Sequence, residues 1–281
     1  MEIRGALKIA TSAADSLSKY ARDYSGKNFS RDFLKAAKVL KAARPTAVSL
    51  PNAVDYCVYL SKENPQDKLP KIIDKFIKEQ EAALEKVAKN GAKRVEKGDT
   101  ILTHCNSTAA IDVIVEASKT KKIKAICTET RPRNQGYLTA AALAKSKVDV
   151  TMIVDSAVRF AIKHFDIDKV VIGADTVAAN GAVANKIGTS QIATLAHEAN
   201  IPVIVACETI KFSPQTMDGS LIEVEERDNA EIRPPMRGVK MWNPAFDFTP
   251  PEYIDIIVTE DGIIPPYMAY EVLKEKFAWE L

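Results

Sequence analysis

The sequence lacks the features of a secreted, membrane-bound or nucleic-acid-binding protein. No apolar run approaches the roughly eighteen residues that a membrane-spanning helix needs, and the first residues show neither the apolar core nor the cleavage site of a signal peptide. The formal net charge is +2, which gives no overall field that would attract nucleic acid or a membrane surface. We therefore expect a cytoplasmic protein with no nucleic-acid or membrane partner.

Histidine and cysteine are scarce, and their spacing does not indicate a metal site. The 3 histidines are too dispersed for a metal triad, and the 4 cysteines contain no Cys-x-x-Cys pair, which argues against a zinc site and a disulfide framework. The chain also has no Walker loop and no G-x-G-x-x-G fingerprint. We expect neither a metal nor a nucleotide cofactor.

Two regions with different residue patterns divide the 281 residues. Residues 1–97 are rich in alanine and lysine and are expected to be helical, with the clearest helix beginning near Pro70, which suits a first turn, and stopping at Gly91. Residues 98–281 instead alternate short β-branched runs with segments of helix length. This order predicts an α/β protein, with a small helical N-terminal domain followed by a doubly wound parallel sheet.

Polar and charged residues follow each expected strand. The apolar runs that we expect as strands are residues 100–103, 123–127, 148–154, 170–172, 202–207 and 254–258. Because the carboxyl ends of parallel strands share one edge of a sheet, the residues after them should meet there. The sequence therefore predicts a ligand-binding site at this edge.

The stretch 169–189 contains one such strand end. Asp175 follows a buried strand among small apolar residues, surroundings that favour the protonated form of a carboxyl group. Asn185 and Lys186 lie shortly before the next helix. Asp175 is therefore a candidate acid, and capping of the next helix is the alternative interpretation.

Cys105 follows another strand, and Asn106-Ser107-Thr108 can cap the helix after it. The dipole of that helix would lower the pKa of Cys105 from its usual value of about 8.5. Cys105 is thus a candidate base or nucleophile, although a small buried hydrophobe is an equally good interpretation. Strand alternation places His104 on the opposite side, which argues against a Cys/His dyad. The other cysteines are assigned to the core.

Several cations lie beside small residues or at strand ends, where they could bind phosphate groups, although any single one is more often a solvated surface charge: Arg4, Arg44, Arg131, Arg133, Lys186 and Lys211. The segment 212–251 is rich in proline and charged residues and breaks the strand–helix alternation. Trp242 and Phe246 favour an ordered loop there that is buried or forms an interface.

Short motifs spread over nearly the whole chain carry a family resemblance. They are HCNS (104–107), ETRPRNQG (129–136), GAD (173–175), NGAVANKIGT (180–189), ETIKFSP (208–214) and NPAFDFTPPEYID (243–255). Together they resemble the sugar-phosphate isomerases related to the regulatory subunits of translation initiation factor 2B, in particular the archaeal ribose-1,5-bisphosphate isomerases. The resemblance implies a Rossmann-like C-terminal domain and a homo-oligomer built from dimers, often a hexamer.

The resemblance also implies roles for individual residues. Cys105 matches the family's proton acceptor, and Asp175 matches its proton donor. Substrate contacts are implied for Arg4, Gly5, Ala6, Leu7, Arg44, Ser107, Thr108, Ala109, Arg131, Gln135, Asn185, Lys186 and Lys211. Leu7 departs from the pattern, because relatives commonly carry a second glycine there, and its side chain could narrow the N-terminal phosphate loop.

The implied activity is the conversion of ribose 1,5-bisphosphate to ribulose 1,5-bisphosphate, within a breakdown of AMP and other nucleoside phosphates that feeds a carboxylase. An aldose with a phosphate on C1 cannot open to a free aldehyde, so a base must remove the C2 proton while an acid protonates the ring oxygen. One alternative is a 5-methylthioribose-1-phosphate isomerase, whose substrate needs an apolar pocket at C5 where Lys211 would suit a phosphate. The other is a non-catalytic regulatory subunit, which would need neither a thiolate nor a buried acid.

Overall fold

The computed structural model describes residues 5–42, 48–216 and 225–278. Its N-terminal part is helical and contains α1 (Ala6–Asp23), α2 (Phe29–Ala42), α3 (Ser49–Glu63) and α4 (Leu69–Ala92). These helices pack around a shared apolar core that includes Leu17, Phe33 and Leu69. The helix expected near Pro70 is confirmed as α4.

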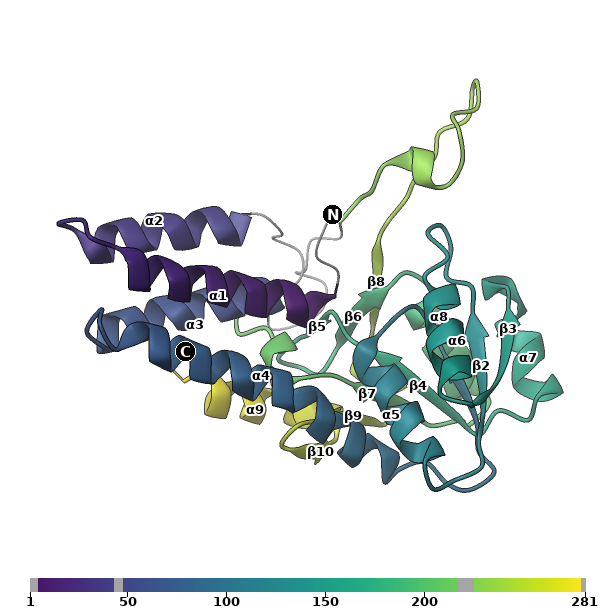
Figure 1. Ribbon diagram of the computed structural model, residues 1–281. Coiled ribbons are helices and arrows are strands. Elements are labelled where there is room, and N and C mark those ends of the chain that lie inside the picture. Colours follow the sequence, from purple (N-terminus) through teal and green to yellow (C-terminus); the bar gives the residue numbers. More distant parts are fainter. Residues whose placement is uncertain (1–4, 43–47, 217–224, 279–281) are drawn as a thin grey trace.

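A seven-stranded sheet forms the centre of the remaining chain, in the order β10-β9-β7-β4-β1-β2-β3 (Figure 1). Its strands are β1 (Thr100–Thr103), β2 (Lys124–Thr128), β3 (Asp149–Ile153), β4 (Lys169–Gly173), β7 (Val203–Ala206), β9 (Ile256–Thr259) and β10 (Gly262–Ile264). All neighbouring pairs are parallel except β9 and β10. The doubly wound sheet is confirmed, and the antiparallel edge strand β10 was not expected.

Helices cover both faces of the sheet. One face packs against α4, α5 (Thr108–Ser118) and α6 (Gly136–Lys145), and the other against α7 (Val158–His164), α8 (Thr189–Glu198) and α9 (Ala269–Lys276). Successive strand residues alternate between the two cores, as Ile101 and Leu102 do. Helix α4 contributes Val87 to the sheet core and Phe76 to the helical core, so it joins the two parts of the chain. The domain division at residues 97 and 98 stays a prediction.

A second, three-stranded sheet lies beside the strand ends. It consists of β5 (Thr176–Val177), β6 (Val183–Lys186) and β8 (Phe246–Thr249), paired antiparallel. The sequence analysis did not expect this sheet, because the partner strand of β6 comes from a distant segment. The described chain also contains short 3₁₀ helices, which are η1 (Asp155–Ala157), η2 (Thr209–Lys211), η4 (Asn229–Glu231), η5 (Pro251–Tyr253) and η6 (Pro266–Met268).

The chain between residues 225 and 245 projects from the body as an arm, drawn in light green in Figure 1. An ordered segment that is buried or forms an interface was expected from Trp242 and Phe246, and the interface stays a prediction. Phe246 is buried where the arm returns to β8, whereas Trp242 is 72% exposed and donates a hydrogen bond to the Glu226 carboxylate (2.9 Å). Within the described residues, no helix combines the length and the apolar character needed to span a bilayer.

Candidate active site at the strand ends

The order of the parallel strands reverses between β1 and β4, with β2 and β3 on one side and β7 and β9 on the other. Open α/β sheets bind ligands at this reversal. Cys105 follows β1, and Asp175 follows β4. Gly173 allows close approach of the two loops, because a Cβ atom there would lie 2.1 Å from Ser107 Oγ. The fold therefore brings together the two strand ends that carry the candidate base and acid.

Cys105 adopts a left-handed backbone conformation (φ 66°), and hydrogen bonds hold its backbone N–H and carbonyl groups. Its N–H donates to Thr130 Oγ1 (2.9 Å), and its carbonyl accepts from Thr139 Oγ1 (2.7 Å). Burial raises the pKa of the thiol to about 11, against the opposing effect of the Lys186 ammonium. The expected lowering of this pKa is wrong, because desolvation of the thiolate outweighs the nearby cations and the helix start.

Helix α5 begins at Thr108, directly after the Cys105 loop. Ser107 is its N-cap, and Ser107 Oγ accepts a hydrogen bond from the N–H of Ala110 (3.4 Å). Thr108 and Ala109 form the first turn, with Ala109 buried against the sheet core. The expected capping segment is confirmed, and it places Ser107 between the Cys105 loop and the end of β4.

Asp175 is half-buried, and its backbone N–H donates to the carbonyl of Ala184 (2.9 Å). Asp175 does not cap a helix, because the element that follows it is strand β5. The start of helix α8 is capped by Asp247 instead. The carboxylate of Asp247 accepts hydrogen bonds from the N–H groups of Gly188 (2.7 Å) and Ser190 (3.1 Å). The capping interpretation of Asp175 is therefore wrong.

The Asp175 charge acts on several groups of the site. The negative charge of Asp175 favours a higher pKa for three side chains, which are the Cys105 thiol and the ammonium groups of Lys186 and Lys211. These side chains come from the ends of β1, β6 and β7. The candidate acid, the candidate base and two cations thus share one electrostatic environment.

Lys186 ends β6 and is buried. Its Nζ donates to the carbonyl of Ala245 (3.0 Å) and lies 4.6 Å from the centroid of the Phe246 ring. Burial lowers the pKa of Lys186. The neighbouring Asn185 donates from its side chain to Thr189 Oγ1 (3.1 Å), at the start of α8.

Lys211 is buried in η2, the short helix after β7. Burial disfavours the charged form of Lys211, but Glu208, whose Oε2 lies 3.3 Å from Nζ, Cys207 and Asp175 together outweigh that effect and raise the pKa of Lys211. Asn52 of α3 holds this segment by donating to the carbonyls of Ile210 (2.7 Å) and Phe212 (2.8 Å). The N-terminal helices are thereby docked next to Lys211.

The N-terminal residues implied as substrate contacts lie at the start of α1. Gly5 is exposed and has a positive φ of 94°, and Ala6 accepts a hydrogen bond at its carbonyl from Ser49 Oγ (3.4 Å) at the start of α3. Leu7 is half-buried and packs against the helical core. Arg4 and Arg44 lie outside the described residues.

Arg131 and Gln135 lie in the loop between β2 and α6. Arg131 is exposed, and its guanidinium donates to the carbonyl of Ile232 in the arm (2.8 Å). Arg133 in the same loop pairs with Glu231. Gln135 is half-buried at the N-cap position of α6. The structure thus shows the loop's arginines bound to the arm.

Three acidic residues, two that follow strands and one within β8, tie neighbouring segments together. Asp155 accepts from the N–H groups of Thr130 (2.8 Å) and Arg131 (2.7 Å), and Glu260 accepts from the N–H of Thr209 (2.9 Å). Asp247 caps α8, and burial raises its pKa to about 6. The NPAFDFTPP motif contained Asp247, but no spacing rule could pair it with a helix start that lies far away in the sequence.

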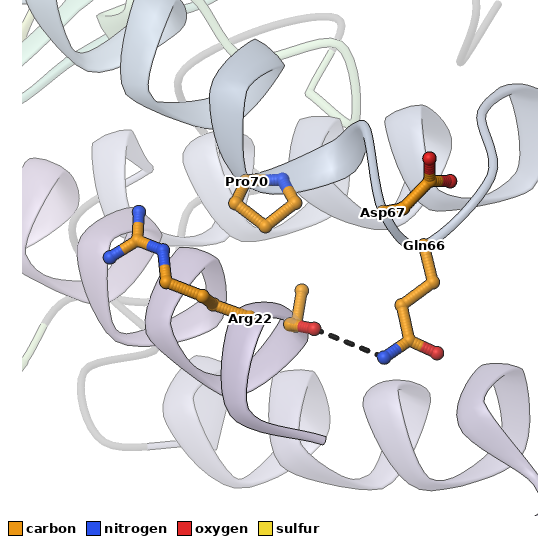
Figure 2. A pocket seen from close by; sticks show the side chains of 5 residues that line it. Arg22, Gln66, Asp67 and Pro70 are labelled. Atoms are coloured by element: carbon orange, nitrogen blue, oxygen red, sulfur yellow. Dashed lines mark hydrogen bonds between the residues drawn. The ribbon is translucent and has the colours of Figure 1, made fainter. Parts of the chain in front are cut away.

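Two hollows lie away from this site. A cavity of about 410 Å³ between α1 and the start of α4 is lined by Arg22 and Pro70, and Gln66 crosses it to donate to the carbonyl of Ala21 (3.1 Å), as Figure 2 shows. A lysine-rich cavity of about 670 Å³ lies at the opposite edge of the sheet, around Lys97 and Lys147. In the described parts of the chain, no group of His, Cys, Asp and Glu side chains is arranged to hold a metal ion.

Curated proteins of two kinds match almost the full chain. A ribose 1,5-bisphosphate isomerase of Methanocaldococcus jannaschii is 51% identical over 287 residues, which cover 99% of this chain and 92% of that protein. A methylthioribose-1-phosphate isomerase of Acetivibrio thermocellus is 41% identical, over 95% of this chain and 86% of that protein. The model of the Initiation factor 2 subunit family matches residues 2–266.

Solved structures share the fold. The Pyrococcus horikoshii OT3 translation initiation factor eIF-2B superposes with a TM-score of 0.83 at 29% identity, covering 95% of this chain and 93% of that chain. A chain of the tetrameric eIF2B-beta2-delta2 complex from C. thermophilum superposes with a TM-score of 0.77 at 19% identity, covering 96% and 89%. The same architecture therefore occurs in proteins that are named as translation initiation factors.

Proposed function

The chain belongs to the Initiation factor 2 subunit family, and from that membership and the site geometry we propose that it is an aldose–ketose isomerase that converts ribose 1,5-bisphosphate to ribulose 1,5-bisphosphate. The observation that carries this proposal is the meeting of a thiol, a carboxyl group and two buried ammonium groups at the reversal of the strand order. The name of the Methanocaldococcus jannaschii relative supports the substrate.

The proposed mechanism uses Cys105 as the base and Asp175 as the acid. The thiolate removes the proton from C2 while the carboxyl group protonates the ring oxygen, and the bond between C1 and that oxygen breaks. The product of this step is an open-chain enol phosphate. Loss of the C2 hydroxyl proton and protonation of C1 then give the ketose, with the phosphate on C1 retained throughout.

The two buried lysines are suited to the phosphate groups of such a substrate. Lys186 and Lys211 present ammonium groups in a region of low solvation, where charge-assisted hydrogen bonds to phosphate oxygens are strong. Lys211, docked beside the N-terminal helices, is proposed to bind the C5 phosphate. A methylthio group in that position would leave the buried cation without a counter-charge from the substrate.

The substrate assignment is tested with two sugars in one assay. We expect ketose formation from ribose 1,5-bisphosphate with a kcat/KM about 10²-fold higher than from 5-methylthioribose 1-phosphate, since a site built around a charged group rejects an analogue that lacks it. Turnover of the methylthio sugar alone would show that the substrate is wrong. If neither sugar reacted, a non-catalytic regulatory subunit would become the better proposal.

The reactivity of Cys105 should depend on pH, because the pKa of its thiol is raised to about 11 in the resting protein. Below its pKa, each unit of pH increases the thiolate fraction about tenfold. We therefore expect the logarithm of the rate at which iodoacetamide alkylates Cys105, a reaction that needs the thiolate but no acid, to rise with pH with a slope near one between about pH 7 and about pH 9. An alkylation rate independent of pH over this range would contradict the raised pKa of the resting thiol.

The biological setting and assembly are also part of the proposal. Ribulose 1,5-bisphosphate would pass to a carboxylase, downstream of AMP and nucleoside-phosphate breakdown. A homo-oligomer built from dimers is proposed by analogy with the tetrameric eIF2B complex, whose chain has the same fold. Sedimentation of the purified protein would distinguish a dimer from a hexamer.

A further inference from the structure

His104 forms a buried bridge between two segments of the candidate site. Its Nε2 lies 2.9 Å from the carbonyl oxygen of Ile187, and its Nδ1 lies 2.6 Å from Thr128 Oγ1. A carbonyl oxygen only accepts, so Nε2 must carry the proton, and in the neutral ring Nδ1 then accepts from the Thr128 hydroxyl. Burial lowers the pKa of His104, which favours this neutral form.

The His104 bridge lies next in sequence to two residues of the proposed reaction, Cys105 and Lys186. His104 directly precedes Cys105, and Ile187 directly follows Lys186. Cys105 belongs to the end of the large sheet, whereas Lys186 belongs to the small sheet. The hydrogen bond from the His104 ring to the Ile187 carbonyl therefore joins the two sheets next to the thiol and next to the ammonium group.

Gly188 shows how closely the two segments fit. A Cβ atom at this residue would lie 3.2 Å from both Cε1 and Nε2 of His104, and the φ of Gly188 is 101°. The loop can thus lie against the imidazole ring because it has no side chain there. A methyl group at this positive φ would strain the loop and press on the ring.

We propose that His104 is a positioning residue that, through the Ile187 carbonyl, holds the Lys186 ammonium where it stabilises the Cys105 thiolate. The inference rests on the proposed function for its role in the reaction, but the contact itself does not. The charged groups that act on the thiol or on the imidazole come from separate elements, and they are Lys186, Asp175, Arg227 and Asp155. Among those acting on the thiol, Lys186 has the largest effect.

The test compares two neutral replacements of the same residue. In His104→Gln the amide nitrogen takes the place of Nε2 and can still donate to the Ile187 carbonyl. In His104→Asn the shorter side chain reaches the place of Nδ1 and loses that donor. Alkylation of Cys105 by iodoacetamide, followed by mass spectrometry of its peptide from about pH 7 to about pH 10, reports the thiolate fraction without any substrate.

We expect His104→Asn to slow alkylation of Cys105 about tenfold at a given pH, which corresponds to a thiol pKa about one unit higher, whereas His104→Gln stays within about threefold of the unmodified protein. Equal rates in a folded His104→Asn variant would overturn the proposal. If that variant does not fold, Gly188→Ala replaces it and is expected to slow alkylation as well, and an unchanged rate in it would count equally against the proposal.

A double variant shows whether His104 acts through Lys186. Lys186→Met removes the ammonium group and should slow alkylation by itself, and adding His104→Asn should then have little further effect. If the double variant slowed alkylation by the product of the two single factors, His104 would not act through Lys186. Because alkylation needs no sugar phosphate, a protein that turns over neither sugar but shows these shifts would refute the proposed function and leave the positioning role standing.

Discussion

A Cys105→Ser variant is expected to lose about 10³-fold in kcat on ribose 1,5-bisphosphate, because a hydroxyl is far too weak an acid to supply the base that a thiolate supplies. The fold should survive, since the backbone bonds of Cys105 to Thr130 and Thr139 do not involve its side chain. Initial rates of ketose formation, with a thermal melt of each protein, provide the measurement.

Cys57→Ala is the matched control for this variant. Cys57 is buried in the helical core, so it has no access to a substrate at the strand ends. Burial also raises the pKa of its thiol to about 12. Its replacement should leave kcat unchanged, apart from a modest loss of thermal stability from the space left in the core. A folded Cys105→Ser protein with nearly full turnover would remove Cys105 from the role of base.

Asp175→Asn is expected to reduce kcat by about 10²- to 10⁴-fold, the usual effect of losing a general acid, because an amide of the same shape cannot transfer a proton to the ring oxygen. The same change should have the opposite effect on Cys105. The Asp175 charge raises the pKa of that thiol, so its removal should speed alkylation by iodoacetamide. Turnover and thiol reactivity would then move in opposite directions.

The control for Asp175→Asn is Asp149→Asn, at the start of β3 on the opposite edge of the sheet. Asp149 is exposed there and lies beside the lysine-rich cavity, away from the strand ends. Its replacement should change neither turnover nor alkylation of Cys105. Retention of normal turnover in Asp175→Asn would require another proton donor to the ring oxygen.

Much of the fold was predictable because the relevant signals are local. Apolar β-branched runs placed all the parallel strands within a few residues of their observed bounds, and the helix expected at Pro70 is α4. The edge strand β10 and the small sheet escaped prediction, since their partners are set by tertiary contacts. Strand β6 pairs with β8, which follows an arm that no periodic pattern describes.

The candidate site was predictable in its members but not in its electrostatics. Strand-end positions and motifs identified Cys105, Asp175, Lys186 and Lys211, whose roles stay predictions. The expected direction of the Cys105 pKa was wrong, because a sequence shows a nearby helix start but not how much water the folded chain excludes. Asp247, which caps α8, was overlooked for a related reason: its partner N–H groups lie on a distant element.

By itself, the sequence determined the alternation of strands and helices, and with it the edge of the sheet at which Cys105 and Asp175 emerge. Both follow from side-chain periodicity and from the shared direction of parallel strands. The tertiary structure alone decided that Lys186 lies in a separate small sheet and that His104 bridges to it through Ile187. It also decided that the Cys105 thiol is desolvated, because burial and cross-sheet contacts depend on the packing of segments far apart in the chain.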